Sequence, residues 1–131
     1  MADSPRIGWN SDLLCDAFML CALESGNIVE KINCASKKIA PCSACFYCKK
    51  SWWAMCISRW YVKNKEFYYI ATLGDVEEKE ANTTIACFKG YEECADGAIE
   101  KGILIASNVY EAGTVASTFK MEEAYVMGKN V

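Results

Sequence analysis

The chain has 131 residues, of which 53% are hydrophobic and 24% are charged, and its formal net charge is −3. This length and apolar content predict one domain, residues 1–131, with enough hydrophobic side chains for a core, and they exclude an intrinsically disordered chain. The acidic balance excludes a general polyanion-binding protein. Because no apolar run reaches the ~18–20 residues of a transmembrane helix, we expect no membrane span.

The N-terminal part of the chain predicts a loose arm, a short helix and a β-hairpin. We expect residues 1–10 to be the arm, and Ser11 and Asp12 to cap the short helix. Residues 17–23 form a continuous apolar run of strand length, and residues 28–32 form a second strand-like run. Because the Glu-Ser-Gly-Asn sequence between them is typical of a turn, the two runs predict a hairpin.

The middle of the chain predicts a helix followed by three strands. Pro41 suits the first position of a helix, because its missing N–H costs nothing there. Beyond this helix the side chains alternate, and aromatic and β-branched residues favour strands. The predicted boundaries are a helix at 41–51 and strands at 53–62, 66–73 and 83–90.

The C-terminal part predicts a long helix and an extension. Apolar residues between 92 and 111 recur at helical spacing, so we expect a helix there that ends near Gly113. Residues 113–131 form the predicted extension, in which residues 120–127 can make a short helix. The element order is therefore α-β-β-α-β-β-β-α. It predicts an α+β fold with a five-stranded antiparallel sheet flanked by helices.

Three short motifs accompany this element order. They are Gly8-Trp9-Asn10 near the start, residues 24–29 at the first turn, and residues 97–101 leading into Ala106-Ser107. With these motifs the chain resembles profilin, and by its element order it also resembles the roadblock dynein-light-chain fold. The resemblance implies that Trp9 belongs to a surface for proline-rich peptides. It also implies an actin-like or self-association surface on the last strands and the helix from Glu92.

Positive charge is concentrated in one part of the chain. Eight of the fourteen basic residues lie from Lys31 to Lys65, where no acid occurs, and the rest of the chain holds all seventeen acids. Such a bipolar chain can attract a charged protein partner or a second copy of itself, giving a dimer. Aromatic residues alternate with the basic ones, which also suits single-stranded nucleic acid. The predicted interaction residues are Trp9, Lys49, Lys50, Trp52, Arg59, Trp60, Lys63 and Lys65.

Nine cysteines are many for a chain of this length, and several are closely spaced. Cys42, Cys45 and Cys48 follow a CxxCxxC pattern, and Cys34 or Cys56 can complete a set of four thiolates for zinc or an iron–sulfur cluster. The second CxxC arm of a typical zinc site is missing, however. Cys42 and Cys45 at a helix start also allow thiol–disulfide exchange, the one enzyme activity that the sequence indicates. Disulfide bonds are a further alternative for these cysteines. We favour free, mostly buried thiols and no cofactor, because free cysteine is among the most often buried residue types.

The absence of common catalytic groups limits the function. The chain contains no histidine, which excludes histidine-based nucleophilic and acid–base catalysis, and no phosphate-binding glycine motif. No signal-peptide pattern is present, so we expect a reducing, cytoplasmic location. The sequence predicts a small non-enzymatic protein-interaction module or adaptor that self-associates. The alternative is a cysteine-rich protein that binds single-stranded nucleic acid and holds a four-cysteine zinc or iron–sulfur site.

Overall fold

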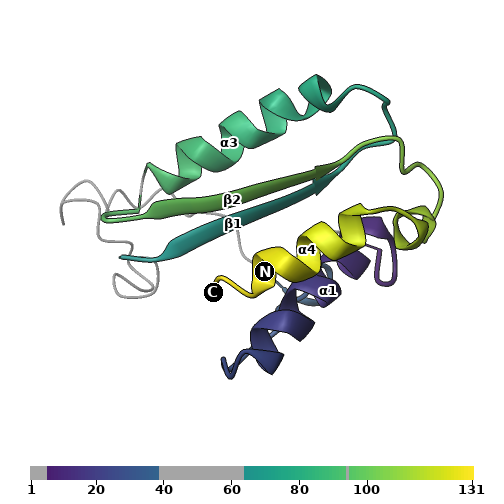
Figure 1. Ribbon diagram of the computed structural model, residues 1–131. Coiled ribbons are helices and arrows are strands. Elements are labelled where there is room, and N and C mark those ends of the chain that lie inside the picture. Colours follow the sequence, from purple (N-terminus) through teal and green to yellow (C-terminus); the bar gives the residue numbers. More distant parts are fainter. Residues whose placement is uncertain (1–5, 39–63, 94) are drawn as a thin grey trace.

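The computed structural model of the protein describes residues 6–38, 64–93 and 95–131. In these ranges three α-helices and two β-strands form three layers (Figure 1). The helices are α1 (Asn10–Glu24), α3 (Asn82–Glu92) and α4 (Lys120–Gly128), and the strands are β1 (Glu66–Thr72) and β2 (Ile99–Ala106). Short 3-10 turns are η1 (Cys34–Ser36), η2 (Glu78–Ala81) and η3 (Thr114–Ser117). None of the helices in these ranges is long and apolar enough to cross a bilayer.

The two strands pair in parallel, from Glu66 opposite Ile99 to Thr72 opposite Ala106. A parallel pair cannot be closed by a tight turn, so the chain crosses over between the strands through η2 and α3, which makes a βαβ unit. The register shifts by one residue after Phe67, which leaves Lys101 as the extra residue of a bulge on β2.

Side chains alternate between the two faces of this sheet, and each face has its own cluster. On one face Tyr69 packs with Ala81 and Ile85 from the η2–α3 segment. On the other face Leu104 packs with the fully buried Leu14 of α1 and with other residues from α4 and η3. Figure 1 shows the result, with α3 over one face and α1 and α4 together over the opposite face. The sheet is therefore covered on both faces, as expected for parallel strands.

Helices α1 and α4 approach each other closely at the end of α4. A Cβ atom added to Gly128 would collide with the backbone carbonyl of Phe18 on α1. The absence of a side chain at position 128 therefore allows the contact. Residues 113–131, predicted as an extension, form η3 and α4 and contribute Val115 and Ala124 to the core.

The predicted five-stranded antiparallel sheet is wrong, because the described residues hold one parallel pair. The predicted first strand, residues 17–23, lies inside α1. That run contains no β-branched residue, and its alanine, leucine and methionine favour a helix. The predicted hairpin turn is a helix end instead: Gly26 has a φ of 91°, and the Asn27 N–H donates to the Ala22 carbonyl at 3.1 Å. This is a Schellman motif, which uses the same Gly-Asn pair as a turn.

Two further elements have the opposite type to the prediction. The predicted strand at residues 83–90 is helix α3, whose Ile85 and Phe88 pack at helical spacing in one cluster with Ala81, the last residue of η2. The predicted helix at residues 92–111 contains strand β2 instead. Because β2 is covered on both faces, its apolar residues run continuously and do not alternate, so their spacing imitates a helix.

Two predicted elements are confirmed. The strand at residues 66–73 is β1, and the short helix at residues 120–127 is α4. The helix at 41–51 and the strand at 53–62 lie outside the described residues.

Candidate interaction surface

The start of α1 holds Trp9, the first of the predicted interaction residues. Trp9 stands at the N-cap position with an extended backbone, and its side chain makes no capping hydrogen bond. The residue is half-buried, and the Arg6 guanidinium lies 4.2 Å from the centre of its ring. A cation in this position is attracted by the ring face and covers it. Trp9 is therefore only partly available as a contact for a partner.

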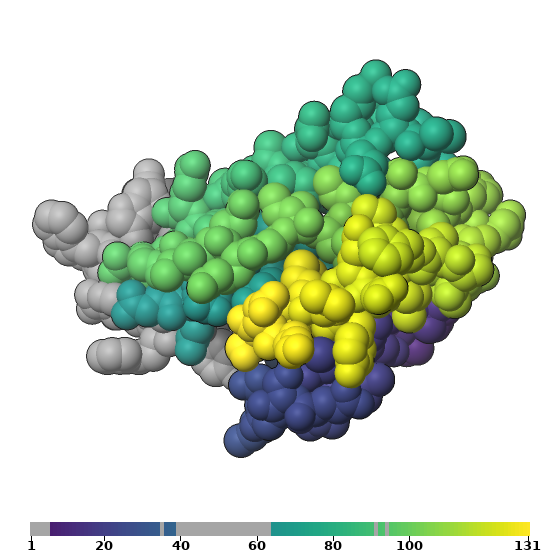
Figure 2. Space-filling view, in the orientation of Figure 1, coloured from purple at the N-terminus to yellow at the C-terminus, as the bar shows by residue number. Residues whose placement is uncertain are grey.

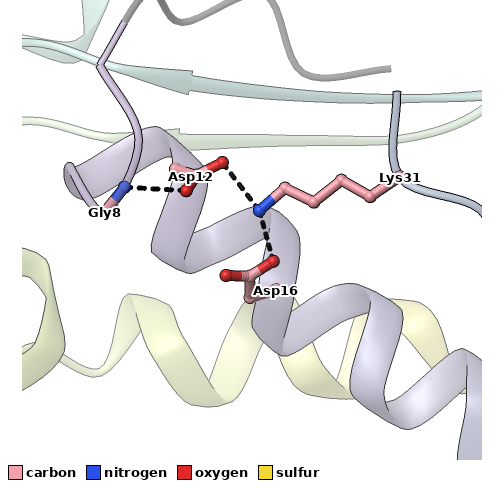
Figure 3. Close-up of polar contacts among 4 residues, drawn as sticks. All are labelled: Gly8, Asp12, Asp16 and Lys31. Carbon is pink, nitrogen blue, oxygen red and sulfur yellow. Dashed lines mark hydrogen bonds and ion pairs between the residues drawn. The ribbon is translucent and has the colours of Figure 1, made fainter. Parts of the chain in front are cut away.

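Just inside α1, two carboxylates of one helix face bind a lysine from the segment that follows the helix (Figure 3). Asp12 accepts from the Gly8 N–H at 2.8 Å and pairs with the Lys31 ammonium at 2.7 Å. Asp16, one turn later, pairs with the same ammonium. The Asp12 side chain is 5% exposed and that of Asp16 is 53% exposed, so the inner pair is the better shielded one.

The hydrogen bonds determine the protonation state of this cluster. Burial opposes ionisation of Asp12, but the Gly8 N–H and the Lys31 ammonium outweigh it and hold the pKa of Asp12 below its usual value. Burial likewise opposes the charge of Lys31, and its two carboxylate partners nevertheless raise its pKa. Burial raises the pKa of the neighbouring Cys15 thiol, which therefore stays protonated. The cluster fixes the segment after α1 and offers no free nucleophile.

Asn10, at the start of α1, connects this helix to the segment between β2 and α4. Its side-chain amide donates to the carbonyls of Val109 and Glu111, both at 2.8 Å, and its side-chain oxygen accepts from the Val115 N–H at 3.2 Å. All these groups lie in the connection between β2 and α4. Asn10 is buried, so it acts as a structural clamp that places η3 and α4 beside the sheet.

The outer edge of β2, the side that faces away from β1, carries backbone groups that no described residue pairs with. The Ala106 carbonyl accepts a hydrogen bond from the Leu73 N–H at the end of β1, so the N–H and C=O groups of Ala106 face inward, toward β1. Because backbone N–H and C=O groups alternate along a strand, those of Leu104 also point inward and those of Ile103 and Ile105 point outward. Among the residues that the structure describes, nothing binds the outward groups of Ile103 and Ile105.

A shallow groove of about 360 Å³ runs along this outer edge. We call it the β2-edge groove, and its lining residues are Glu78, Ile103, Leu104, Ile105, Lys120, Glu123 and Met127. Figure 2 views the molecule from this side, with the green atoms of β2 lying open between α3 and the yellow α4. The floor is apolar strand, and charged side chains stand on both rims.

One lysine bridges the two rims of the groove. Lys120, the first residue of α4, pairs with Glu78 of η2 at 3.3 Å and with Glu123 of α4 at 3.0 Å. Burial opposes its charge, but the two carboxylates outweigh this and raise the pKa of Lys120. The ammonium is therefore a stable positive charge, and the rims together carry two negative charges against one positive. The Lys120 side chain is 30% exposed, so solvent and a ligand can reach it.

The remaining predicted site residues divide into two groups. Lys65 is exposed beside β1, and its carbonyl accepts from the Ile99 N–H at 2.9 Å. Cys34 lies in η1 as a half-buried free thiol. The structure brings neither of them to the β2-edge groove. The others lie outside the described residues: Lys49, Lys50, Trp52, Arg59, Trp60, Lys63, Cys42, Cys45, Cys48 and Cys56. The four-cysteine zinc or iron–sulfur site, the thiol–disulfide pair and the nucleic-acid surface therefore stay predictions.

Sequence reasoning missed the groove because it assigned β2 to a helix. The apolar run Ile103-Leu104-Ile105, which begins after a glycine and contains two β-branched residues, is the available signal for a buried parallel strand. No sequence signal marks Glu78 and Lys120 as neighbours, since they lie 42 positions apart and on different elements.

Comparison with known proteins identifies no relative of this chain. No protein family, no curated protein and no solved structure matches the chain. In residues 6–38, 64–93 and 95–131, no group of histidine, cysteine or acidic side chains is arranged to hold a metal ion.

Proposed function

We propose that this chain is a small, non-enzymatic protein-interaction module and that the outer edge of β2 is part of its contact surface. The observation that carries the proposal is the pair of outward-facing backbone positions at Ile103 and Ile105, which have no partner among the described residues. An open strand edge offers a row of donors and acceptors to another protein chain, and folded proteins normally cover or charge such an edge.

The shape of the surface supports a protein partner more than a small molecule. Small-molecule sites are usually concave and bury most of the ligand between several walls. The β2-edge groove is instead a shallow strip along one strand, with an apolar floor and charged rims. A strip of this kind matches an extended polypeptide, which presents backbone groups and side chains in a regular repeat.

The proposal is tested by closing the edge without disturbing the fold. Ile105→Pro removes the outward N–H of Ile105, which has no partner in the described part of the sheet, and places a ring at the edge. Ile105→Ala is the matched control, because it loses a similar side-chain volume and keeps the N–H. We expect quantitative affinity capture from the cells that express the protein to recover the same partners with wild type and Ile105→Ala.

The same partners should be lost with Ile105→Pro. If all three proteins recover one common set, the outer edge of β2 is not the contact surface, and the proposal fails. Circular dichroism of each variant verifies that the comparison is made between folded proteins.

A further inference from the structure

We infer that the β2-edge groove binds an extended segment of a partner protein that carries basic side chains, and that this segment adds to the sheet as a third strand. The inference rests on the proposed function and specifies its partner. It is drawn from three features: the outward backbone groups, the geometry of the rims and the sign of their charge.

The backbone supplies the first part of the recognition. Ile103 and Ile105 are two residues apart, so their outward N–H and C=O groups recur at the repeat of a β-strand. An extended peptide placed alongside satisfies these groups through its own backbone, whatever its side chains are. The two positions lie in the middle of the groove, between the rims formed by η2 and by α4.

Side chains of an added strand would point alternately toward the two rims. One set would face the η2 side, where Glu78 stands, and the other set would face Glu123 and Met127 on α4. Each rim therefore offers a carboxylate to the incoming strand, and the α4 rim adds an apolar contact. This arrangement favours a strand with long basic side chains that have apolar stems.

The charge of the surroundings points to the same partner. The segment 75–80, which leads into and includes part of η2, holds Asp75, Glu77, Glu78 and Glu80 against one base, Lys79. In the free protein, Lys120 is the cation that the two rim carboxylates share. An incoming lysine or arginine can replace it at Glu78 or Glu123, since exposed ion pairs are weak and exchange readily.

A second copy of the chain is a poorer occupant. Antiparallel pairing of β2 with the β2 of another molecule would bring the Glu78 and Glu123 rims of both molecules to one seam. Like charges placed opposite one another oppose the association. A basic strand meets no such repulsion, so the rim charges favour a basic strand over a second copy of the chain.

Defined peptides test the inference directly. The probe is a fluorescein-labelled hexapeptide of alternating lysine and valine, titrated with the full chain and followed by fluorescence anisotropy. The controls are an alternating glutamate and valine peptide, and two lysine–valine peptides N-methylated at every other residue, one in each phase. We expect saturable binding of the parent peptide, no binding of the glutamate peptide, and at least about a tenfold loss for one of the N-methylated peptides.

Two protein variants locate the binding at the rim. Glu123→Lys should weaken the parent peptide about tenfold. Glu122→Lys makes the same change of charge one residue away on an exposed position that does not line the groove, and it should leave the affinity within about twofold. Both proteins are first shown to be folded by circular dichroism.

Any of three peptide results would overturn the inference: no binding of the lysine–valine peptide, equal binding of the glutamate peptide, or full binding by both N-methylated peptides. A dimer in light scattering that Ile105→Pro dissociates would also overturn it, in favour of a second copy. In each of these cases, the capture experiment with Ile105→Pro still decides the proposed function by itself. Failure of the basic strand and failure of the interaction surface are thereby distinguished.

Discussion

The ammonium of Lys120 lies 3.3 Å from the carboxylate of Glu78, and this pair joins the two faces of the molecule across the outer edge of β2. Lys120 begins α4 on one side of the sheet, and Glu78 begins η2 on the other. Charged side chains, lysine above all, are a common means of protecting an open strand edge. Among the described residues, this protection is the half-buried side chain of Lys120, which spans the edge and leaves the backbone groups of Ile103 and Ile105 open to a ligand.

Removing the bridging cation should favour a basic ligand. Lys120→Gln should change the free energy of unfolding by less than about 1 kcal/mol, because exposed ion pairs contribute little. It should also raise the affinity for the lysine–valine peptide several-fold, since the rim carboxylates lose their internal partner. Urea unfolding and anisotropy titration measure the two effects, with Lys129→Gln at the exposed end of the chain as the control. A lower affinity of Lys120→Gln for the peptide would show that Lys120 does not compete with the ligand.

Neighbouring proline substitutions should report which backbone groups belong to the sheet. Leu104→Pro removes an N–H that points toward β1 and also the buried Leu104 side chain, so it should cost about 3 kcal/mol or more. Ile105→Pro removes an outward N–H and should cost only the loss of side-chain packing, about 1–2 kcal/mol, close to Ile105→Ala. Denaturant unfolding monitored by circular dichroism compares the three variants. Equal costs for the two prolines would mean that the N–H of Ile105 has a partner.

The Asp12–Lys31 pair should make the stability of the fold decrease at acidic pH. The pKa of Asp12 is lowered in the folded protein, so its contribution to stability is present above its usual pKa and is lost as the pH falls through the folded value. Asp12→Asn should therefore cost about 1–2 kcal/mol at neutral pH, and less once the pH falls below the lowered pKa of Asp12.

Asp16→Asn is the matched control, because Asp16 binds the same ammonium from an exposed position. It should cost less than Asp12→Asn at neutral pH. Urea unfolding of both variants over a pH series gives the comparison. If the cost of Asp12→Asn did not depend on pH, the carboxylate would not be ionised in the folded state.

The hydroxyl of Tyr69 should lose its proton at a higher pH than an ordinary tyrosine. Its buried ring stacks on Phe88 with the ring centres 5.1 Å apart, and its hydroxyl donates to Glu92 at 2.8 Å. Burial first, and then the Glu92 carboxylate, raise its pKa to about 12. Since the unfolded group ionises near pH 10, its contribution to stability is full below pH 10 and is lost between about pH 10 and pH 12.

Ultraviolet absorbance of tyrosinate measures this directly. In Tyr69→Phe, the part of the transition near pH 12 should shrink by one tyrosine, while Tyr125, whose pKa is also raised to about 12 by its contact with Glu24, keeps its share. An unchanged late transition in Tyr69→Phe would show that Tyr69 is accessible to base.

The cysteines distinguish the interaction module from its alternative. We expect native mass spectrometry of the reduced chain, offered zinc, to show the mass of the metal-free protein, and alkylation after unfolding to label all nine thiols. One tightly bound zinc per chain, lost in Cys45→Ser, would favour the four-cysteine site instead. The same spectra report whether the chain is a monomer or a dimer.

Local signals in the sequence predict some elements of this fold correctly, and they fail where tertiary burial determines the structure. Residues 66–72 are rich in aromatic and β-branched side chains, so β1 is evident from the sequence. The Gly26-Asn27 pair serves equally in a hairpin turn and in a helix end, and only the continuous helix before it decides between them.

The second strand could not be assigned because both of its faces are covered. Ile103 and Ile105 pack toward α3, while Leu104 packs toward α1 and α4. These three positions are therefore all apolar, and the sequence lacks the alternation that marks a strand with one exposed face. When β2 is assigned as a helix, neither the outer edge of the sheet nor the β2-edge groove can be predicted. The pairing of Lys120 with Glu78 depends on three elements meeting in space, which spacing along the chain does not encode.

Amide hydrogen exchange of β2, measured by NMR on the free monomer, tests the central claim most directly. Ile103 and Ile105 should exchange quickly because their N–H groups face outward and bind no described residue, while Leu104 and Ala106, which face β1, should be strongly protected. Saturation with the lysine–valine peptide should slow Ile103 and Ile105 and leave Leu104 and Ala106 unchanged. Equal protection of all four amides in the free monomer would contradict the account, because it would mean that the outer edge of β2 is already paired.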